Sequence, residues 1–291
     1  MNKNNCLSLH SVKPKNIIVM KRIKTFIALA LCSICLSAYS AGNNTTMPEI
    51  ELGKTTPKPV TVERNCSTFV SIENKTACNI TYKQGEQFKV SITAPEENID
   101  KIKTSVVDDI LIVEMEENTF IKETKNVKIN IESPSLMYVA VTGAGNITSQ
   151  TPLETSGKPL LLSVKGSGSL KFKKINCSEI AVGITGSGNA EVSDVKAKSS
   201  EIEIKGSGSV ELSGMKISKK IEINVLGSGN AAINGSADNV KVNISGSGNV
   251  TGKVNCDNVS AIIKGSGDVK FSGDVKSHNT EVTGSGRVTI K

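Results

Sequence analysis

The chain has 291 residues, with no tryptophan, three tyrosines and six phenylalanines, and a formal charge of +7 from 35 basic and 28 acidic residues. Residues 1–41 hold six of the basic residues and no acidic one, so the remaining chain has 29 basic and 28 acidic residues, a net charge of +1. This near-neutral remainder excludes a nucleic-acid surface built on positive charge, and the scarcity of aromatic rings disfavours the sugar platforms of a polysaccharide-degrading enzyme.

The N-terminal segment has the pattern of a secretory signal peptide. A basic start, Met20-Lys-Arg-Ile-Lys24, precedes the apolar run Thr25–Ser37 and the small residues around Ala38. We therefore assign residues 20–40 to the signal peptide and residues 1–19 to an N-terminal extension upstream of the start that the cell uses. The apolar run is too short to span a bilayer comfortably, and no second one follows. We expect an exported chain with no transmembrane segment after signal cleavage.

Residues 41–64 read as a linker, and residues 65–136 as degenerate solenoid turns with a cap. Three segments there alternate apolar and polar residues as strands do, but no glycine corner follows them: Phe88–Ile92, Ile110–Met115 and Val127–Ile131. Cys66 and Cys78 lie close together in this part, and an exported protein meets an oxidising compartment. A disulfide between them closes a 13-residue loop, which the chain-entropy model values at about 3 kcal/mol.

Residues 137–291 contain a glycine-x-glycine triplet eight times, at intervals of 19 to 23 residues. The triplets begin at Gly143, Gly166, Gly186, Gly206, Gly227, Gly246, Gly265 and Gly284. Two and four residues before each triplet the chain is mostly apolar and often β-branched, as at Ile202 and Ile204, and polar residues such as Glu203 lie between. Apolar residues resume four residues after the triplet, as at Val210. Each repeat is therefore a strand, a glycine corner and a second strand.

A period near 20 residues is the signature of a solenoid, in which each repeat buries its apolar side against its neighbours. The sequence thus predicts an all-β fold, a parallel β-helix with about 20 residues per turn and Gly-Ser-Gly corners. The eight glycines are predicted to be structural, because corners need positive φ or close backbone approach. Cys177 and Cys256, about four turns apart, are predicted to be small buried thiols.

No motif indicates a catalytic, cofactor or metal site. The triplets lead into strands, whereas a dinucleotide-binding fingerprint leads into a helix. Asn, Ser or Asp often follows the triplet, but the period of about 20 does not fit a nine-residue calcium repeat. We interpret this column as a hydrogen-bonded stack along the coil. After signal cleavage, His278 is the one remaining histidine, and we interpret it as a polar cap of the final turn.

The chain resembles the head GIN domain family of predicted auto-transporter adhesins, first catalogued as a domain of unknown function. The resemblance runs from about Val60 to Lys291 and rests on three features: the strands 88–92 and 110–113, the segment Ser133-Pro-Ser-Leu-Met-Tyr-Val139 that leads to Thr142-Gly-Ala-Gly145, and the Gly-Ser-Gly corners. It implies a right-handed parallel β-helix exported to the periplasm or outer surface of a Gram-negative bacterium. It implies no catalytic or binding residue.

Together these observations predict a secreted, non-enzymatic β-solenoid binding module, an adhesin of the bacterial surface or periplasm. Its partner is a surface ligand, a glycan or a protein, and nucleic acid is not expected. Two alternatives stay open. One is a polysaccharide-active β-helix enzyme that uses a shallow face, and the other is an envelope scaffold that self-associates into a homo-oligomer through the solenoid ends.

Overall fold

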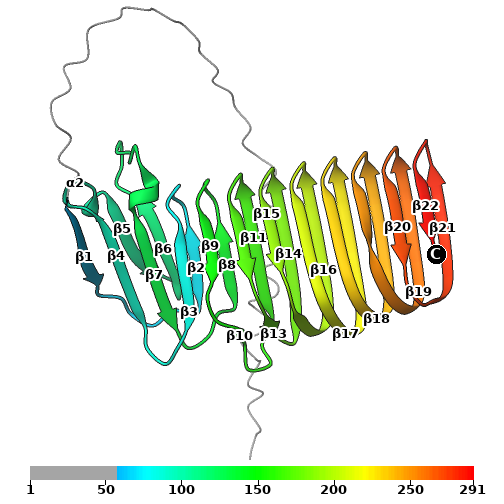
Figure 1. The fold of residues 1–291 in the computed structure, drawn as a ribbon, viewed down its shortest axis with the longest axis horizontal. Coiled ribbons are helices and arrows are strands. Elements are labelled where there is room, and N and C mark those ends of the chain that lie inside the picture. The colour runs from blue at the N-terminus through cyan, green and yellow to red at the C-terminus, as the bar shows by residue number, and fades with distance from the viewer. Residues whose placement is uncertain (1–57) are drawn as a thin grey trace, which may run out of the picture. The chain divides into compact units, whose positions relative to one another are not determined.

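The computed structural model describes residues 58–291, so the predicted signal peptide and N-terminal extension lie outside the described residues. Strands dominate this part of the chain and join in one hydrogen-bonded sheet that winds as a solenoid (Figure 1). The solenoid has about eight turns of about 20 residues with parallel stacking, which confirms the predicted fold class. Two regions of it differ in how the chain runs: residues 137–291 and residues 58–136.

Residues 137–291 form the regular array, in which each strand pairs in parallel with the strand one turn further along the chain. Within the array, Ile184 pairs with Ile204, and Ile204 pairs with Val225. The strands are β8 (Tyr138–Val141), β9 (Asn146–Ser149), β10 (Leu153–Glu154), β11 (Leu160–Gly166), β12 (Ser169–Phe172), β13 (Ile175–Asn176), β14 (Glu179–Gly186), β15 (Asn189–Val192), β16 (Val195–Gly206), β17 (Ser209–Gly227), β18 (Asn230–Gly246), β19 (Asn249–Gly265), β20 (Asp268–Ser272), β21 (Val275–Thr283) and β22 (Arg287–Ile290).

The interior of the array is a ladder of mostly apolar side chains. Ile202 and Ile204 are completely buried, and so are Ile223 and Val242 in the following turns. The polar residues between them face outward, as the alternation predicts; Glu203 forms an ion pair with Lys205. Each turn therefore buries its apolar side only because its neighbours cover it, and hydrophobic burial is shared along the whole stack.

The glycine corners fall into two kinds. Seven of the eight predicted glycines have φ between 114° and 132°, which L-residues rarely adopt: Gly166, Gly186, Gly206, Gly227, Gly246, Gly265 and Gly284. A Cβ at Gly206 would also lie 2.6 Å from the carbonyl oxygen of Gly186 in the preceding turn. Gly143 does not have a left-handed backbone, but a Cβ there would lie 2.4 Å from the carbonyl oxygen of Thr76. Close approach requires glycine at this eighth corner.

Residues 58–136 are not successive turns of the coil. Their elements are β1 (Pro59–Arg64), β2 (Ser71–Asn74), β3 (Ile80–Gln84), β4 (Lys89–Pro95), α2 (Glu96–Ile99), β5 (Ile102–Val107), β6 (Ile110–Met115), the 3-10 helix η1 (Thr124–Asn126) and β7 (Lys128–Ser133). The strands β6 and β7 stack in parallel on β2 and β3, which in turn stack on β8 and β9. The turn made by β2 and β3 comes first in the sequence. In space it lies between the turn made by β6 and β7 and the turn made by β8 and β9, which both come later in the sequence (Figure 1).

Two sequence-based assignments in this region need correction. The segment 88–92, predicted to be a degenerate turn, belongs to β4, which is antiparallel to both β1 and β7. Residues 59–64, assigned to the linker, form β1 at the sheet's edge. Period-two alternation shows which side chains are buried, but it is the same for parallel and antiparallel strands. Strand direction and chain order were therefore not readable from the pattern.

All cysteines in the part of the chain that the structure describes are free thiols. The structure therefore does not contain the predicted disulfide between Cys66 and Cys78. Cys78 is completely buried and lies in a tight corner, where its backbone N–H donates to the Thr76 hydroxyl. Cys66 is half-buried in the segment between β1 and β2. Cys177 and Cys256 are buried, as predicted, and burial raises the pKa of the Cys177 thiol to about 12.

Candidate functional site

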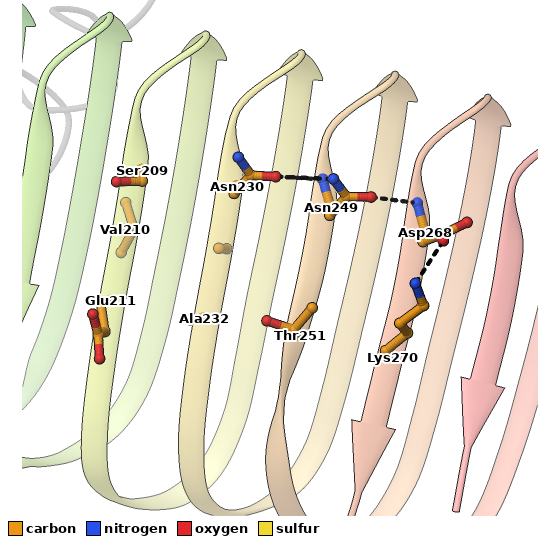
Figure 2. Close-up of a pocket in the computed structure, with 10 residues that line it drawn as sticks. Ser209, Val210, Glu211, Asn230, Ala232, Asn249, Thr251, Asp268 and Lys270 are labelled. Carbon is orange, nitrogen blue, oxygen red and sulfur yellow. Dashed lines mark hydrogen bonds and ion pairs between the residues drawn. The ribbon is translucent and has the colours of Figure 1, made fainter.

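The outward face of β17, β18, β19 and β20 carries two parallel rows of side chains. The first row follows the glycine corners and contains Ser209, Asn230, Asn249 and Asp268. The second row lies two residues further along each strand and contains Glu211, Ala232, Thr251 and Lys270. Alternation along a strand puts residues two apart on the same face, and parallel stacking aligns them from turn to turn. The rows therefore run along the axis of the solenoid (Figure 2).

Hydrogen bonds between neighbouring turns hold the first row in place. The amide oxygen of Asn230 accepts from the backbone N–H and the side-chain amide of Asn249, at 3.2 and 3.0 Å. The amide oxygen of Asn249 in turn accepts from the backbone N–H of Asp268 at 3.1 Å (Figure 2). Similar bonds join Ser209 to Asn189 and Ser169 to Asn146. These contacts confirm the predicted Asn and Ser stack, and they fix the side-chain orientations of the row.

The second row dips at Ala232 and leaves a shallow hollow of about 450 Å³ on this face. The residue aligned with Ala232 is longer in the neighbouring turns: Glu211 on one side and Thr251 on the other. Only a methyl group therefore stands where the other turns project a polar side chain, and Figure 2 shows the gap between Glu211 and Thr251. Ala232 forms the floor of the hollow, and the first row borders it.

The hollow has two carboxylates and one ammonium group. Lys270 lies 2.9 Å from Asp268, and its hydrogen bond holds the pKa of that carboxyl below the usual value. Glu211 has no ion-pair partner within residues 58–291. The formal charge of the lining is therefore −1, with the unpaired charge at the Glu211 side.

The arrangement offers hydrogen-bond donors and acceptors to a ligand. Among residues 58–291, no group of three or more His, Cys, Asp or Glu side chains is placed to hold a metal ion. His278 is exposed in β21, on the last described turn. No helix in the described residues is long and apolar enough to cross a membrane.

The predicted structural glycines form the corners and do not line the hollow, so none of the site residues predicted from the sequence belongs to it. Its signal was nevertheless present in the aligned repeats. The position of Ala232 holds Lys171, Glu191 and Glu211 in three preceding turns and Lys270 two turns later. A small residue in a column of long polar ones predicts a local dip, but only once the register is known.

The chain matches one protein-family model and is similar in fold to several solved structures. The family model described as "Putative auto-transporter adhesin, head GIN domain" matches residues 68–238 and 222–291. A solved "putative adhesin" from Parabacteroides distasonis superposes with a TM-score of 0.71 and 18% identity, covering 81% of this chain and 98% of its own. A "putative adhesin" from Parabacteroides merdae gives 0.70 and 21%, covering 81% and 97%.

A third solved structure carries a different description. The "Putative lipid binding protein" from Parabacteroides distasonis superposes with a TM-score of 0.66 and 20% identity, over 81% of this chain and 98% of that one. No curated protein sequence matches this chain. At these identities the structural matches show a common fold only.

Proposed function

The chain belongs to the head GIN domain family, described as putative auto-transporter adhesins, and from this premise we propose that it is a secreted, non-enzymatic binding module of the bacterial surface or periplasm. Its partner is a surface ligand, and the outward rows with the hollow at Ala232 are its contact surface. The family description supports an exported location. The sequence pattern of a signal peptide at residues 20–40 agrees with it.

The observation that carries the proposal is the hollow with its bordering row of fixed side chains. A binding surface gains affinity when its groups are already ordered, because less side-chain entropy is lost on binding. The interturn bonds of Asn230 and Asn249 supply this order. The same surface contains one carboxylate without an ion-pair partner, Glu211, and one ion pair, Lys270–Asp268, and its hydroxyl and amide groups can form hydrogen bonds with a ligand.

The first test is binding by the purified mature chain to immobilised surface glycans and extracellular-matrix proteins. We expect retention on at least one of them, and no release of reducing sugar from any glycan. Retention on none would overturn the binding role. Release of reducing sugar would support the alternative of a polysaccharide-active enzyme.

Location is tested separately by adding protease to intact cells and detecting the mature chain with an antibody. Cleavage on intact cells is expected for a surface adhesin. Cleavage only after the outer membrane is opened would place the chain in the periplasm, where it cannot mediate adhesion to other cells.

A second candidate function, an envelope scaffold that self-associates, is favoured by one observation. Nearly all residues of β21 are exposed, and Val282 in its apolar column is 40% exposed. Exposed strand edges pair readily with other chains. Sedimentation of the mature chain at increasing concentration checks this function: a dimer that forms with concentration supports it, and a monomer throughout contradicts it.

A further inference from the structure

We propose that the hollow at Ala232 binds a neutral glycan, lying extended along the solenoid axis and held by hydrogen bonds from the two rows. This inference rests on the proposed binding function and specifies its ligand. Four turns contribute to the hollow, from Ser209 to Asp268. Their three intervals span about 14 Å at the spacing of neighbouring strands, which is the scale of a short oligosaccharide segment.

The first argument is that this face has no free backbone groups for a peptide. The strand β18 pairs with β17 on one side and β19 on the other, and β20 pairs with β19 and β22. Peptides that add to a sheet need an unpaired edge, and none exists here. Recognition at the hollow therefore depends on side chains alone.

The second argument is the kind of hydrogen-bonding group that the hollow presents. The amide oxygens of Asn230 and Asn249 are occupied by the next turn, whereas each side-chain NH₂ has two donors. Amide donors therefore remain along the first row. The second row adds the Thr251 hydroxyl and the Glu211 carboxylate, which accepts. Neighbouring donors and acceptors match sugar hydroxyl groups, each of which both donates and accepts.

The third argument is charge, which favours a neutral glycan over an acidic one. The lining has a formal charge of −1, because Lys270 is paired with Asp268 and Glu211 is unpaired. A carboxylate, sulfate or phosphate group on the ligand would meet this excess negative charge. The floor at Ala232 is a methyl group, which leaves room for a sugar ring and contacts its apolar carbon atoms. No aromatic ring lines the hollow, so we expect weak binding that increases with the number of sugar units.

The experiment is affinity electrophoresis of the mature chain through gels that contain one polysaccharide each. The neutral probes are dextran, laminarin and galactomannan, and the acidic probes are alginate and heparin. We expect at least one neutral polysaccharide to retard the chain and both acidic ones to leave it unretarded.

Two variants and one control test the site. Ala232→Arg fills the hollow from an outward position and is expected to weaken the retardation at least about tenfold. Ser260→Arg introduces the same side chain at an outward position of β19 that does not line the hollow, and should leave retardation unchanged. Glu211→Gln keeps an oxygen acceptor and removes the charge, so we expect it to reduce the discrimination against alginate.

Three results would overturn the inference: no retardation by any neutral probe, retardation by the acidic probes alone, or equal retardation of wild type and Ala232→Arg. The proposed function fails differently, since it also covers protein ligands. If Ala232→Arg still binds a matrix protein while no glycan is bound, the binding module stands and the glycan assignment falls.

Discussion

The regular array and the N-terminal region build the same stacked turns from different sequence relationships. In the array a residue and its neighbour one turn further along the chain are 19 to 23 positions apart; Ile184 and Ile204, for example, are 20 apart. In the N-terminal region Ile80 lies between Ile129 and Ile147, which are 49 and 67 positions away. A periodic sequence thus specifies its own neighbours. Where the period is lost, the chain forms the same stack in a different order, at the cost of long-range contacts that form slowly.

The corners of the two regions also use different chemistry. In the array a left-handed glycine, such as Gly206, turns the chain. In the turn from β2 to β3 the side chain of Asn74 does this work: its oxygen accepts from the Thr76 backbone and hydroxyl, and its nitrogen donates to the Cys78 carbonyl. A buried polar network therefore replaces backbone freedom.

The largest effect is expected from a charge in the ladder of the array. Ile204→Asp buries an unpaired carboxylate at a completely buried site and should destabilise the fold by about 4 kcal/mol or more, because nothing nearby neutralises it. Glu203→Lys, one residue away and facing outward, should cost well under 1 kcal/mol. Urea denaturation followed by circular dichroism compares the two. Equal losses of stability would mean that the inward and outward assignments are wrong.

Next in size is a change at a glycine corner. Gly206→Ala forces an L-residue to φ of 122° and places its Cβ 2.6 Å from the Gly186 carbonyl oxygen, so we expect a loss of about 2–3 kcal/mol. The matched control is Gly183→Ala in β14, where a Cβ meets nothing within 4 Å and φ is not left-handed. That variant should be neutral or more stable by about 0.5 kcal/mol. A destabilised Gly183→Ala would show that glycine content itself, rather than corner geometry, limits stability.

The corresponding change in the N-terminal region is Asn74→Ala. It leaves the Cys78 carbonyl and the Thr76 donors without their buried partner, and we expect a loss of about 2 kcal/mol. Asn243→Ala in the array removes one side-chain hydrogen bond, which Asn243 donates to Asn224 of the preceding turn at a partly buried site. This loss should lower the stability by less than about 1 kcal/mol. Thermal unfolding of both variants makes the comparison. If Asn74→Ala and Asn243→Ala lose the same stability, the hydrogen bonds of Asn74 do not hold the turn from β2 to β3 as the glycines hold the corners of the array.

The difference between the regions also explains what the sequence could and could not predict. The sequence predicted the apolar alternation around Ile202, the corner glycines and the Asn and Ser stack, because each of these features recurs at a fixed offset in successive turns. The sequence did not predict that β2 and β3 lie between turns that come later in the chain. This turn has no repeat motif, so its residues cannot be aligned with those of the turns that stack on it. The hollow depends on a single short side chain, Ala232, among longer ones. It becomes visible only when the stacking of the turns is known.

The smallest expected effect concerns a polar residue in the apolar ladder of the array. Ser200 is buried between Ile180 and Ile221, and its hydroxyl has no hydrogen-bond partner within residues 58–291. Removing an unsatisfied buried hydroxyl lowers the free energy of the folded state, so Ser200→Ala should stabilise the chain by about 1 kcal/mol.

The matched change is Ser149→Ala in β9. Ser149 is equally buried, but its hydroxyl donates to the Thr151 carbonyl at 2.7 Å, and its loss should destabilise by about 1 kcal/mol. Opposite signs in urea titrations of the two variants are the expected result, because the substitution is the same and only the partner differs. Destabilisation in both would show that the Ser200 hydroxyl has a partner in solution, such as an enclosed water molecule.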